Sequence, residues 1–231
     1  MIKYLLTFLA LLGIGYMFFP LVMEFSTPTR LNPLAEAYVS SSVNDLNMPN
    51  VVTAIVVSYR GLDTLGEVTV LFLATAGVGF LLRKRNHEAI FRRQGSEILR
   101  IGASFLAPLI IVFGVYIFTH GHLSPGGGFQ GGVVMASGIL LMVLACKEFS
   151  FSHNLIHFVE SLSGVGYVLM ALTGLLLIGF DSFLDPRFLP KGEWLSLFSS
   201  GAVPIIYSLI GLKVGSELSS VIDSMQTGGE K

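Results

Sequence analysis

Six long apolar stretches dominate the chain. They cover approximately residues 2–23, 51–82, 98–119, 128–146, 155–180 and 201–222. A transmembrane helix needs about 20 largely apolar residues to cross about 30 Å of hydrocarbon, and each stretch is close to that length or longer. The pattern therefore predicts an all-α, polytopic membrane protein with about six transmembrane helices.

The first apolar stretch has two interpretations, a signal peptide and a retained helix. Residues 4–19 have the character of a signal-peptide core, but no small-residue cleavage site follows and residues 20–23 extend the apolar run. We therefore expect a retained helix. After it, Asn32 as an N-cap and Pro33 at the first helical position predict a short helix that ends near residue 44.

Composition agrees with a membrane protein and excludes several functions. Of the 231 residues, 52% are apolar and 13% are charged, whereas soluble domains carry about 25% charged residues. The single cysteine, Cys146, cannot form a disulfide framework, a four-cysteine zinc site or the ligand set of an iron–sulfur cluster. The net charge of −1 provides no basic surface for nucleic acid. We expect no cofactor in this chain, and no electron transfer by it alone.

The positions of lysine and arginine predict the orientation, because cytoplasmic loops are enriched in both. The segment 83–93, between the second and third stretches, holds five of the 14 basic residues and is expected to be cytoplasmic. Alternating from there places nine basic residues inside (Lys3, Arg83, Lys84, Arg85, Arg92, Arg93, Arg100, Lys147 and Lys231) and three outside (Arg30, Arg187 and Lys191). The prediction is an N-in, C-in chain that crosses the cell membrane several times.

The same basic segment marks the predicted internal boundary. It is the longest polar run, and it separates two hydrophobic units of different character. We place the boundary at Gly95. The chain is thereby divided into a two-helix unit, residues 1–95, and a four-helix domain, residues 96–231.

The second apolar stretch contains three charged residues, Arg60, Asp63 and Glu67. Their spacing of three and four places them on one helical face, where they can pair. Each costs about 2.5–3.5 kcal/mol at the centre of a bilayer, so we expect them to face protein or water. Because the stretch is long and contains Gly61 and Gly66, a locally opened helix is also expected. The three residues fit a proton or cation relay, and they also fit a lock between this helix and a neighbour.

Two further pairs of ionisable residues lie in the last two stretches. Lys213 and Glu217 are one turn apart, and either a relay or snorkelling of the lysine to the interface would explain them. His157 and Glu160 share one face near the start of their helix. A histidine beside a carboxylate titrates near neutral pH, which fits proton uptake, but a solvated position at the membrane edge fits equally.

A glycine-rich segment joins the third and fourth stretches. Its predicted turn and helix-packing residues are His120, Gly121, Pro125, Gly126, Gly127, Gly128, Gly131 and Gly132. Part of it formally matches the dinucleotide pattern GxGxxG, but an apolar helix precedes it where a strand is required. Glycine permits tight turns and close helix contacts, so we expect those roles instead.

The chain shows no sequence pattern for a metal or for hydrolytic chemistry. His120 and His122 lack a nearby thiolate or carboxylate and are a poor ligand set, so no metal is expected. The motifs of serine hydrolases, zinc proteases and nucleotide-driven pumps do not occur. We therefore expect no catalytic residue and no enzymatic activity of this chain by itself.

Residues 96–231 resemble the MnhB/MrpB subunit of multisubunit Mrp-type sodium/proton antiporters. The resemblance rests on the segment His120-Gly121-His122 with Ser124-Pro125-Gly126-Gly127-Gly128-Phe129-Gln130-Gly131-Gly132, which is similar to that family's GHxxPGGGFxGG turn. The run Tyr59-Arg60-Gly61-Leu62-Asp63-Thr64-Leu65-Gly66-Glu67 resembles an element of the large antiporter subunit and of the MbhE-type subunit of membrane-bound hydrogenases. A fusion of the two units is similar to the arrangement in archaeal membrane-bound sulfane reductases and hydrogenases.

The resemblance implies a sodium-translocating module of a larger respiratory complex. Its implied partners are other Mrp-like antiporter subunits, a redox arm and the lipid bilayer, with Na⁺ and/or H⁺ as the transported ions. Iron–sulfur clusters, and nickel in a hydrogenase, are implied in partner subunits and not in this chain.

Three classes of function remain open at this point. The first is an ion-translocating subunit in which Arg60, Asp63 and Glu67 line the path. The second is a scaffold subunit of the same complex or of a stand-alone antiporter, with the charges as helix locks. The third is a self-sufficient six-helix carrier, although such carriers usually contain inverted repeats and the RGLDTLGE pattern occurs once.

Overall fold

The structure is a computed structural model, and it describes residues 2–24, 30–83, 95–147, 149, 152–178 and 183–227. The chain forms two compact units, Met1–Ala37 and Tyr38–Lys231. Most of the predicted cytoplasmic segment, residues 84–94, lies outside the described residues. The N-in, C-in orientation and the boundary at Gly95 therefore stay predictions.

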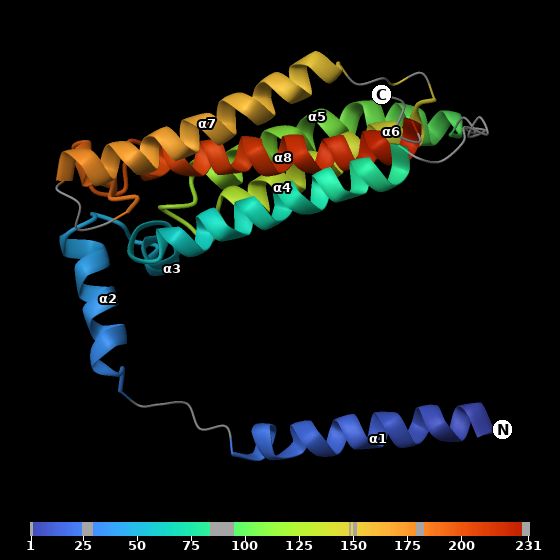
Figure 1. Cartoon of the computed structure of the whole chain (residues 1–231), viewed down its shortest axis with the longest axis horizontal. Coiled ribbons are helices and arrows are strands. Elements are labelled where there is room, and N and C mark those ends of the chain that lie inside the picture. Colours follow the sequence, from blue (N-terminus) through green and yellow to red (C-terminus); the bar gives the residue numbers. More distant parts are fainter. Residues whose placement is uncertain are drawn as a thin grey trace. The chain divides into compact units, whose positions relative to one another are not determined.

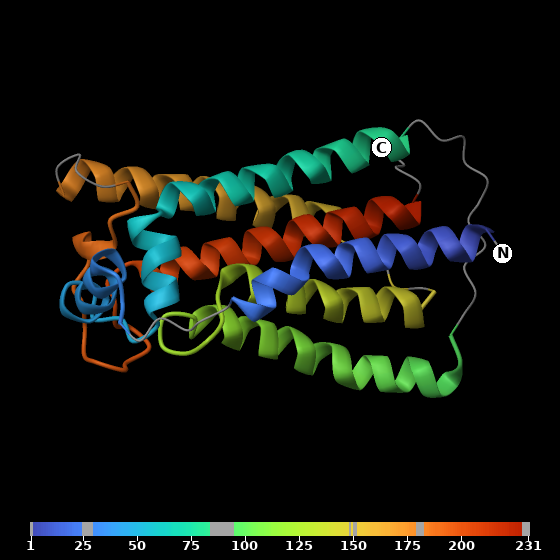
Figure 2. The ribbon, with the colours of Figure 1, turned by 90° about the horizontal axis from the view of Figure 1, so that it is seen from below.

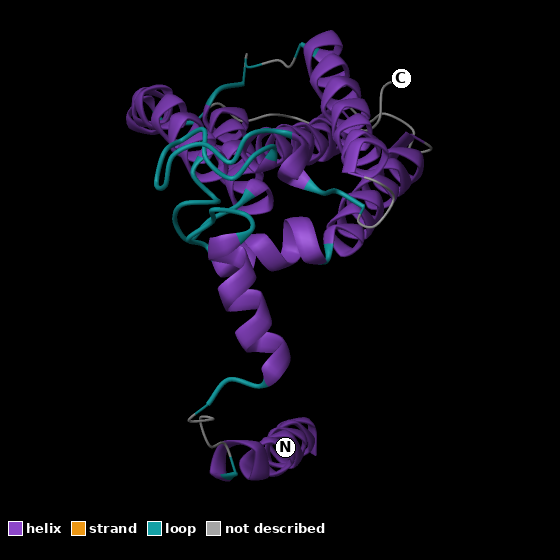
Figure 3. Cartoon of the chain, turned by 90° about the vertical axis from the view of Figure 1, so that its left-hand side faces the viewer, coloured by secondary structure: helices purple, strands orange, loops and turns teal. Residues whose placement is uncertain are grey.

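Helices make up the secondary structure, and no strand occurs in the described ranges (Figure 3). Six helices are long and apolar enough to cross a membrane, which confirms the predicted fold class. They are α1 (Ile2–Met23), α4 (Gly61–Arg83), α5 (Glu97–Thr119), α6 (Gly128–Ala145), α7 (His153–Ile178) and α8 (Val203–Thr227). Two short helices, α2 (Pro33–Asn44) and α3 (Val51–Thr53), lie between α1 and α4 in the chain (Figure 1). A π-helical segment, Ala54–Tyr59, and a 3₁₀ helix, Pro186–Phe188, complete the order.

The first unit contains α1 and the start of α2. Every residue of α1 is exposed within this chain, and its sides are apolar all round. Such a helix is stable when lipid or other apolar surface surrounds it. The side chain of Asn32 accepts a hydrogen bond from the backbone N–H of Ala35 at 2.7 Å, and Pro33 begins α2, so the predicted cap and helix are both present.

The second apolar stretch forms two helical pieces. A six-residue π-helical turn, Ala54–Tyr59, separates α3 from α4, and Arg60 leaves helical geometry with φ −122° and ψ 35°. The Thr64 hydroxyl donates a 2.6 Å hydrogen bond to the Val56 carbonyl and so satisfies one backbone group freed by the break. The expected local opening of the helix therefore lies at Arg60, the first of the three charged residues, and Asp63 and Glu67 follow in the first two turns of α4.

The second unit is a bundle with α8 along its middle. This helix packs against α4, α5, α6 and α7, and α5 packs along α6 (Figures 1 and 2). Glycines allow the closest contacts: a Cβ placed on Gly131 would lie 2.6 Å from the Gly114 carbonyl oxygen of α5. A Cβ on Gly132 would lie 2.7 Å from the Gly211 carbonyl oxygen of α8. The glycines after the turn thus seat α6 between its two neighbours.

The bundle has two unlike ends. We call the end formed by α3, residues 120–127 and residues 183–202 the loop end. The opposite end, where α4 finishes at Arg83, α5 begins at Glu97 and α8 finishes, is called the basic end. Buried apolar residues from the loop end to the middle of the bundle, among them Val57, Tyr167 and Ile206, form its core.

Candidate functional site

A buried group of charges lies between α7 and α8. The ammonium Nζ of Lys213 is 2.7 Å from Oε1 of Glu217 and 3.5 Å from Oε1 of Glu160. Glu217 is completely buried, and the side chains of Lys213 and Glu160 are only 10% and 16% exposed. We call these three residues the α7–α8 cluster.

The cluster lies deep in the membrane-spanning part of the bundle. Lys213 stands in the middle of the apolar stretch Val203–Met225. Its Nζ is 4.9 Å from the centre of the Phe72 ring on α4, a cation–π distance. Gly164 of α7 lies against the lysine chain, since a Cβ there would be 3.5 Å from Lys213 Cε, an ordinary van der Waals distance. Three helices therefore form the walls around one ammonium group.

The charges of the cluster do not cancel when all three groups are ionised. Two carboxylates face one ammonium, and Oε2 of Glu217 has no hydrogen-bond partner among the residues that the structure describes. An uncompensated buried charge is costly, so such a group takes up a proton or a cation, or finds another partner. The arrangement can therefore hold one monovalent cation or proton beside Glu217.

Further ionisable residues continue from the cluster toward the basic end. His157 Nδ1 is 3.6 Å from Oε2 of Glu160, and the His157 side chain is largely exposed. His153 is the first residue of α7, one turn before His157, and its Nδ1 is 3.0 Å from Oδ2 of Asp223 on α8. Two His–carboxylate pairs thus lie along α7 and α8 between the basic end and the buried cluster.

The tertiary structure brings together two pairs that sequence reasoning treated separately. Lys213 does not snorkel, since its ammonium group is held inside the protein by carboxylates of two helices. Sequence reasoning missed His153 and Asp223. The spacing of His153 from His157 and Glu160, by four and seven residues, was a signal that could have identified the histidine.

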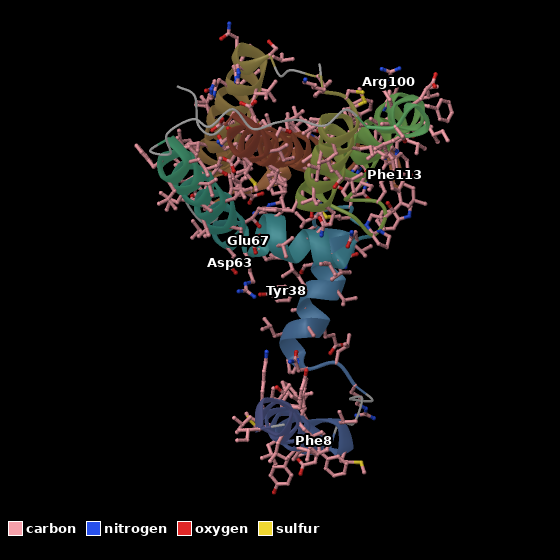
Figure 4. All side chains as sticks on the ribbon, turned by 90° about the vertical axis from the view of Figure 1, so that its right-hand side faces the viewer. Phe8, Tyr38, Asp63, Glu67, Arg100 and Phe113 are labelled. Atoms are coloured by element: carbon pink, nitrogen blue, oxygen red, sulfur yellow. The ribbon has the colours of Figure 1, made fainter. Side chains whose placement is uncertain are left out.

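The charges of α4 form a separate group. Arg60 and Asp63 form an ion pair in which both side chains are exposed. Glu67 is also exposed, and Figure 4 shows Asp63 on the outer side of α4. The predicted pairing along this face is present, but the face is not joined to the α7–α8 cluster.

The glycine turn is held by hydrogen bonds from the segment before α4. The Gly121 carbonyl accepts from Asn50 Nδ2 at 2.8 Å and from the Thr53 hydroxyl at 2.6 Å. Tyr207 of α8 donates to the Thr53 hydroxyl at 3.0 Å, and a Cβ on Gly121 would lie 2.6 Å from the Tyr207 ring. Glycine is thus required at 121 by close approach, and the turn ties α3 to α8.

The two histidines of the turn have different surroundings. The His120 ring contacts the Tyr116 ring, with 4.2 Å between centroids, whereas His122 is completely buried. Nε2 of His122 is 3.4 Å from the Ser196 carbonyl oxygen, and Nδ1 has no partner in the described part of the chain. No group of three or more His, Cys, Asp or Glu residues in that part is arranged to hold a metal.

Burial lowers the pKa of His122, because the apolar surroundings disfavour the charged imidazolium. A histidine whose pKa falls on folding binds its proton more readily in the unfolded state. Its contribution to stability is complete above the unfolded pKa of about 6.5 and is lost as the pH falls from there toward the folded pKa. We expect the melting temperature of the purified protein in detergent to fall below about pH 6.5.

The variant His122→Gln should lose the part of this fall in melting temperature that His122 causes, because glutamine does not titrate. The partly buried neighbour provides a matched control, and His120→Gln should keep the wild-type pH profile. Equal acid sensitivity of the His122→Gln variant and the wild type would contradict the assignment.

A polar cavity of about 330 Å³ lies at the loop end beside the π-helical turn. Tyr59, Arg60 and Arg187 are among its lining residues. The buried Asp185 carboxylate accepts hydrogen bonds from Arg187 Nε at 2.8 and 2.9 Å and raises the pKa of Arg187. Two of the charged residues around this cavity, Asp185 and Arg187, are therefore paired with each other.

These features define a polytopic membrane subunit with a buried charged cluster and a glycine turn. Residues 98–220 match the family described as a domain related to the MnhB subunit of Na⁺/H⁺ antiporter, and residues 4–93 match the MbhE family of MBH subunits. The chain belongs to the MnhB-related family, as its resemblance predicted. Membership places it among the membrane subunits of multisubunit ion-translocating complexes.

Two relatives are similar to this chain over most of its length. A chain in the structure of the membrane-bound sulfane sulfur reductase, an archaeal respiratory membrane complex, is 41% identical with a TM-score of 0.81, and the match covers 97% of this chain and 98% of that one. An uncharacterized protein of Methanocaldococcus jannaschii is 28% identical over 225 residues, which cover 82% of this chain and 84% of that protein.

Two bacterial antiporter proteins match over a smaller share of one chain or the other. A Na⁺/H⁺ antiporter subunit of Bacillus subtilis is 36% identical over 90 residues, which cover 38% of this chain and 57% of that protein. A chain of the Mrp complex from a Dietzia species shares the fold, with a TM-score of 0.70 and 23% identity, and the match covers 96% of this chain and 26% of that one.

Proposed function

We propose that this chain provides part of the ion path in the Mrp-like antiporter module of a cell-membrane respiratory complex. The host complex is of the sulfane-reductase or hydrogenase type, and the ion is Na⁺ and/or H⁺. The α7–α8 cluster binds the ion on its way through the chain. One observation carries the proposal: Lys213 lies at mid-span between two carboxylates, one of them completely buried.

A small movement of Lys213 can change which of the two carboxylates it pairs with. Lys213 contacts Glu217 at 2.7 Å and Glu160 at 3.5 Å, so a shift of the ammonium group toward Glu160 frees Glu217 for an incoming cation or proton. Return of the ammonium group then expels that ion by like-charge repulsion. His157, His153 and Asp223 connect the cluster to solvent at the basic end.

The redox reaction of the host complex belongs to other subunits in this proposal. A chain with one cysteine lacks the thiolates that an iron–sulfur cluster needs. Partner subunits therefore carry the iron–sulfur clusters, and the nickel in a hydrogenase. The chain translocates ions without catalysing a chemical step.

A scaffold function is the second candidate, and the same ion pairs fit it, because Lys213 joins α8 to Glu160 of α7. In that case the buried charges only hold α7 against α8. The two functions differ in what a neutral substitution does to transport once the complex has assembled.

We expect Glu217→Gln to lower ion transport at least about tenfold, which equals about 1.4 kcal/mol in the barrier. Glutamine keeps the shape of glutamate but cannot exchange a proton or bind a cation electrostatically. The measurement is Na⁺ uptake and pH-gradient formation in inverted vesicles that contain the assembled complex. The control, Glu97→Gln, neutralises an exposed acid in the first turn of α5 and should leave transport unchanged. Wild-type transport by an assembled Glu217→Gln complex would support the scaffold function instead.

A further inference from the structure

One face of α4 combines carboxylates with small residues. Asp63, Gly66, Glu67, Val70 and Ala74 follow each other at spacings of three, one, three and four, so they share one side of the helix. All five are exposed in this chain, and Val70 is 66% exposed. We call these five residues the α4 face.

The α4 face is turned away from the bundle. Gly61, Thr64 and Val68 are buried and mark the side of α4 that contacts the bundle. Asp63 projects away from that side (Figure 4), whereas Glu67 lies at the edge of the α4 face, close enough to α7 to interact electrostatically with Tyr167. No helix of the second unit therefore covers these carboxylates.

Lipid is an unfavourable environment for this face. Asp63 and Glu67 lie within the apolar span Gly61–Leu82, where an unpaired charge costs up to about 2.5–3.5 kcal/mol. Arg60 neutralises Asp63 through their ion pair. Glu67 forms no ion pair with any residue in the described ranges. When Glu67 is ionised, the face carries one uncompensated negative charge, which a positive charge from outside the bundle would balance.

The shape of the α4 face suits a helix better than lipid chains. Two of its residues, Gly66 and Ala74, are small, and a Cβ on Gly66 would meet nothing within 4 Å. Small residues let two membrane helices approach closely, which gives good packing in lipid. A neighbouring helix could therefore place a long basic side chain beside Glu67.

We propose that the α4 face is the docking surface for a transmembrane helix of another subunit, and that this helix presents a lysine or arginine to Glu67. Charge complementarity selects the partner, because a purely apolar helix would leave Glu67 unpaired. Arg60, Asp63 and Glu67 thus hold subunits together in addition to any part they take in ion transfer. This inference is independent of the proposed role of the α7–α8 cluster.

The first experiment maps what covers the face in the intact complex. Cys146 is the only cysteine, so a Cys146→Ser background allows one new thiol, introduced by Val70→Cys, to carry a benzophenone photo-crosslinker. Val112→Cys, at an equally exposed valine on α5, controls for non-specific capture. We expect the Val70→Cys variant to capture a transmembrane peptide of another subunit that contains lysine or arginine, and the Val112→Cys variant not to capture that peptide. Capture of lipid alone, of the same chain, or of a helix without a basic residue would overturn the proposal.

The second experiment tests the charge itself. Glu67→Lys should reduce co-purification of the captured subunit at least tenfold, and exchanging the partner's basic residue for glutamate should restore it. A Glu67→Lys complex that retains the subunit at wild-type stoichiometry would also overturn the proposal. Both readouts concern assembly, so their failure is distinguishable from a failure of Glu217→Gln to change transport.

Discussion

Replacing Lys213 with methionine is expected to destabilise the protein by about 3–5 kcal/mol, which is the usual effect of removing one partner of a buried ion pair. Methionine has similar length but no charge, so Glu217 would remain buried beside an apolar group and Glu160 would lose its nearest cation. The melting temperature of the purified protein in detergent should fall accordingly.

A double substitution separates stability from transport at the same site. Lys213→Met combined with Glu217→Gln removes the stranded charge and should recover most of the lost stability, because neutral pairs of similar shape tolerate burial. We expect the recovered complex to transport ions no faster than Glu217→Gln alone. If Lys213→Met melts at the wild-type temperature, the cluster does not contribute to stability as an ion pair.

The second large effect is expected at Gly131, where α6 meets α5. A Cβ there would lie 2.6 Å from the Gly114 carbonyl oxygen and 2.9 Å from Phe118 Cβ. Both neighbours are constrained by the α5 helix, so Gly131→Ala should push the helices apart and cost about 1–3 kcal/mol, as overpacking commonly does. Less assembled complex and a lower melting temperature are the measurable results.

Gly102 on α5 provides the matched control, because a Cβ at that position would meet nothing within 4 Å. Gly102→Ala should be neutral or stabilising by about 0.5–1 kcal/mol, since alanine loses less backbone entropy than glycine in a helix. The opposite order of stability for the two variants would show that close contact between α5 and α6 is not what requires Gly131.

The glycine turn shows how far local sequence can predict a site. The run of glycines after Pro125 predicted a tight turn followed by close helix packing, and the contacts of Gly131 and Gly132 lie at that position. Nothing in the run predicted that Asn50 and Thr53, some 70 residues earlier, would donate hydrogen bonds to Gly121. Those bonds depend on where α3 lies in three dimensions.

The charged residues show even more clearly that local sequence does not predict contacts between distant segments. Spacing along each helix predicted the pairs Arg60 with Asp63, His157 with Glu160, and Lys213 with Glu217, because residues three or four apart share a helical face. Spacing cannot say which face meets a neighbouring helix. The structure places the pair on α8 against Glu160 inside the bundle, and it leaves the charges of α4 on the outside.

The sequence by itself determined the membrane class, the six spans and the family, because the length and apolarity of each stretch and the motif residues are local properties. Only the tertiary structure decided which charges are buried together, which glycines touch a neighbour and which face of α4 is left for a partner. Burial and pairing depend on contacts between helices far apart in sequence, and these are set by the packing of the whole bundle around α8.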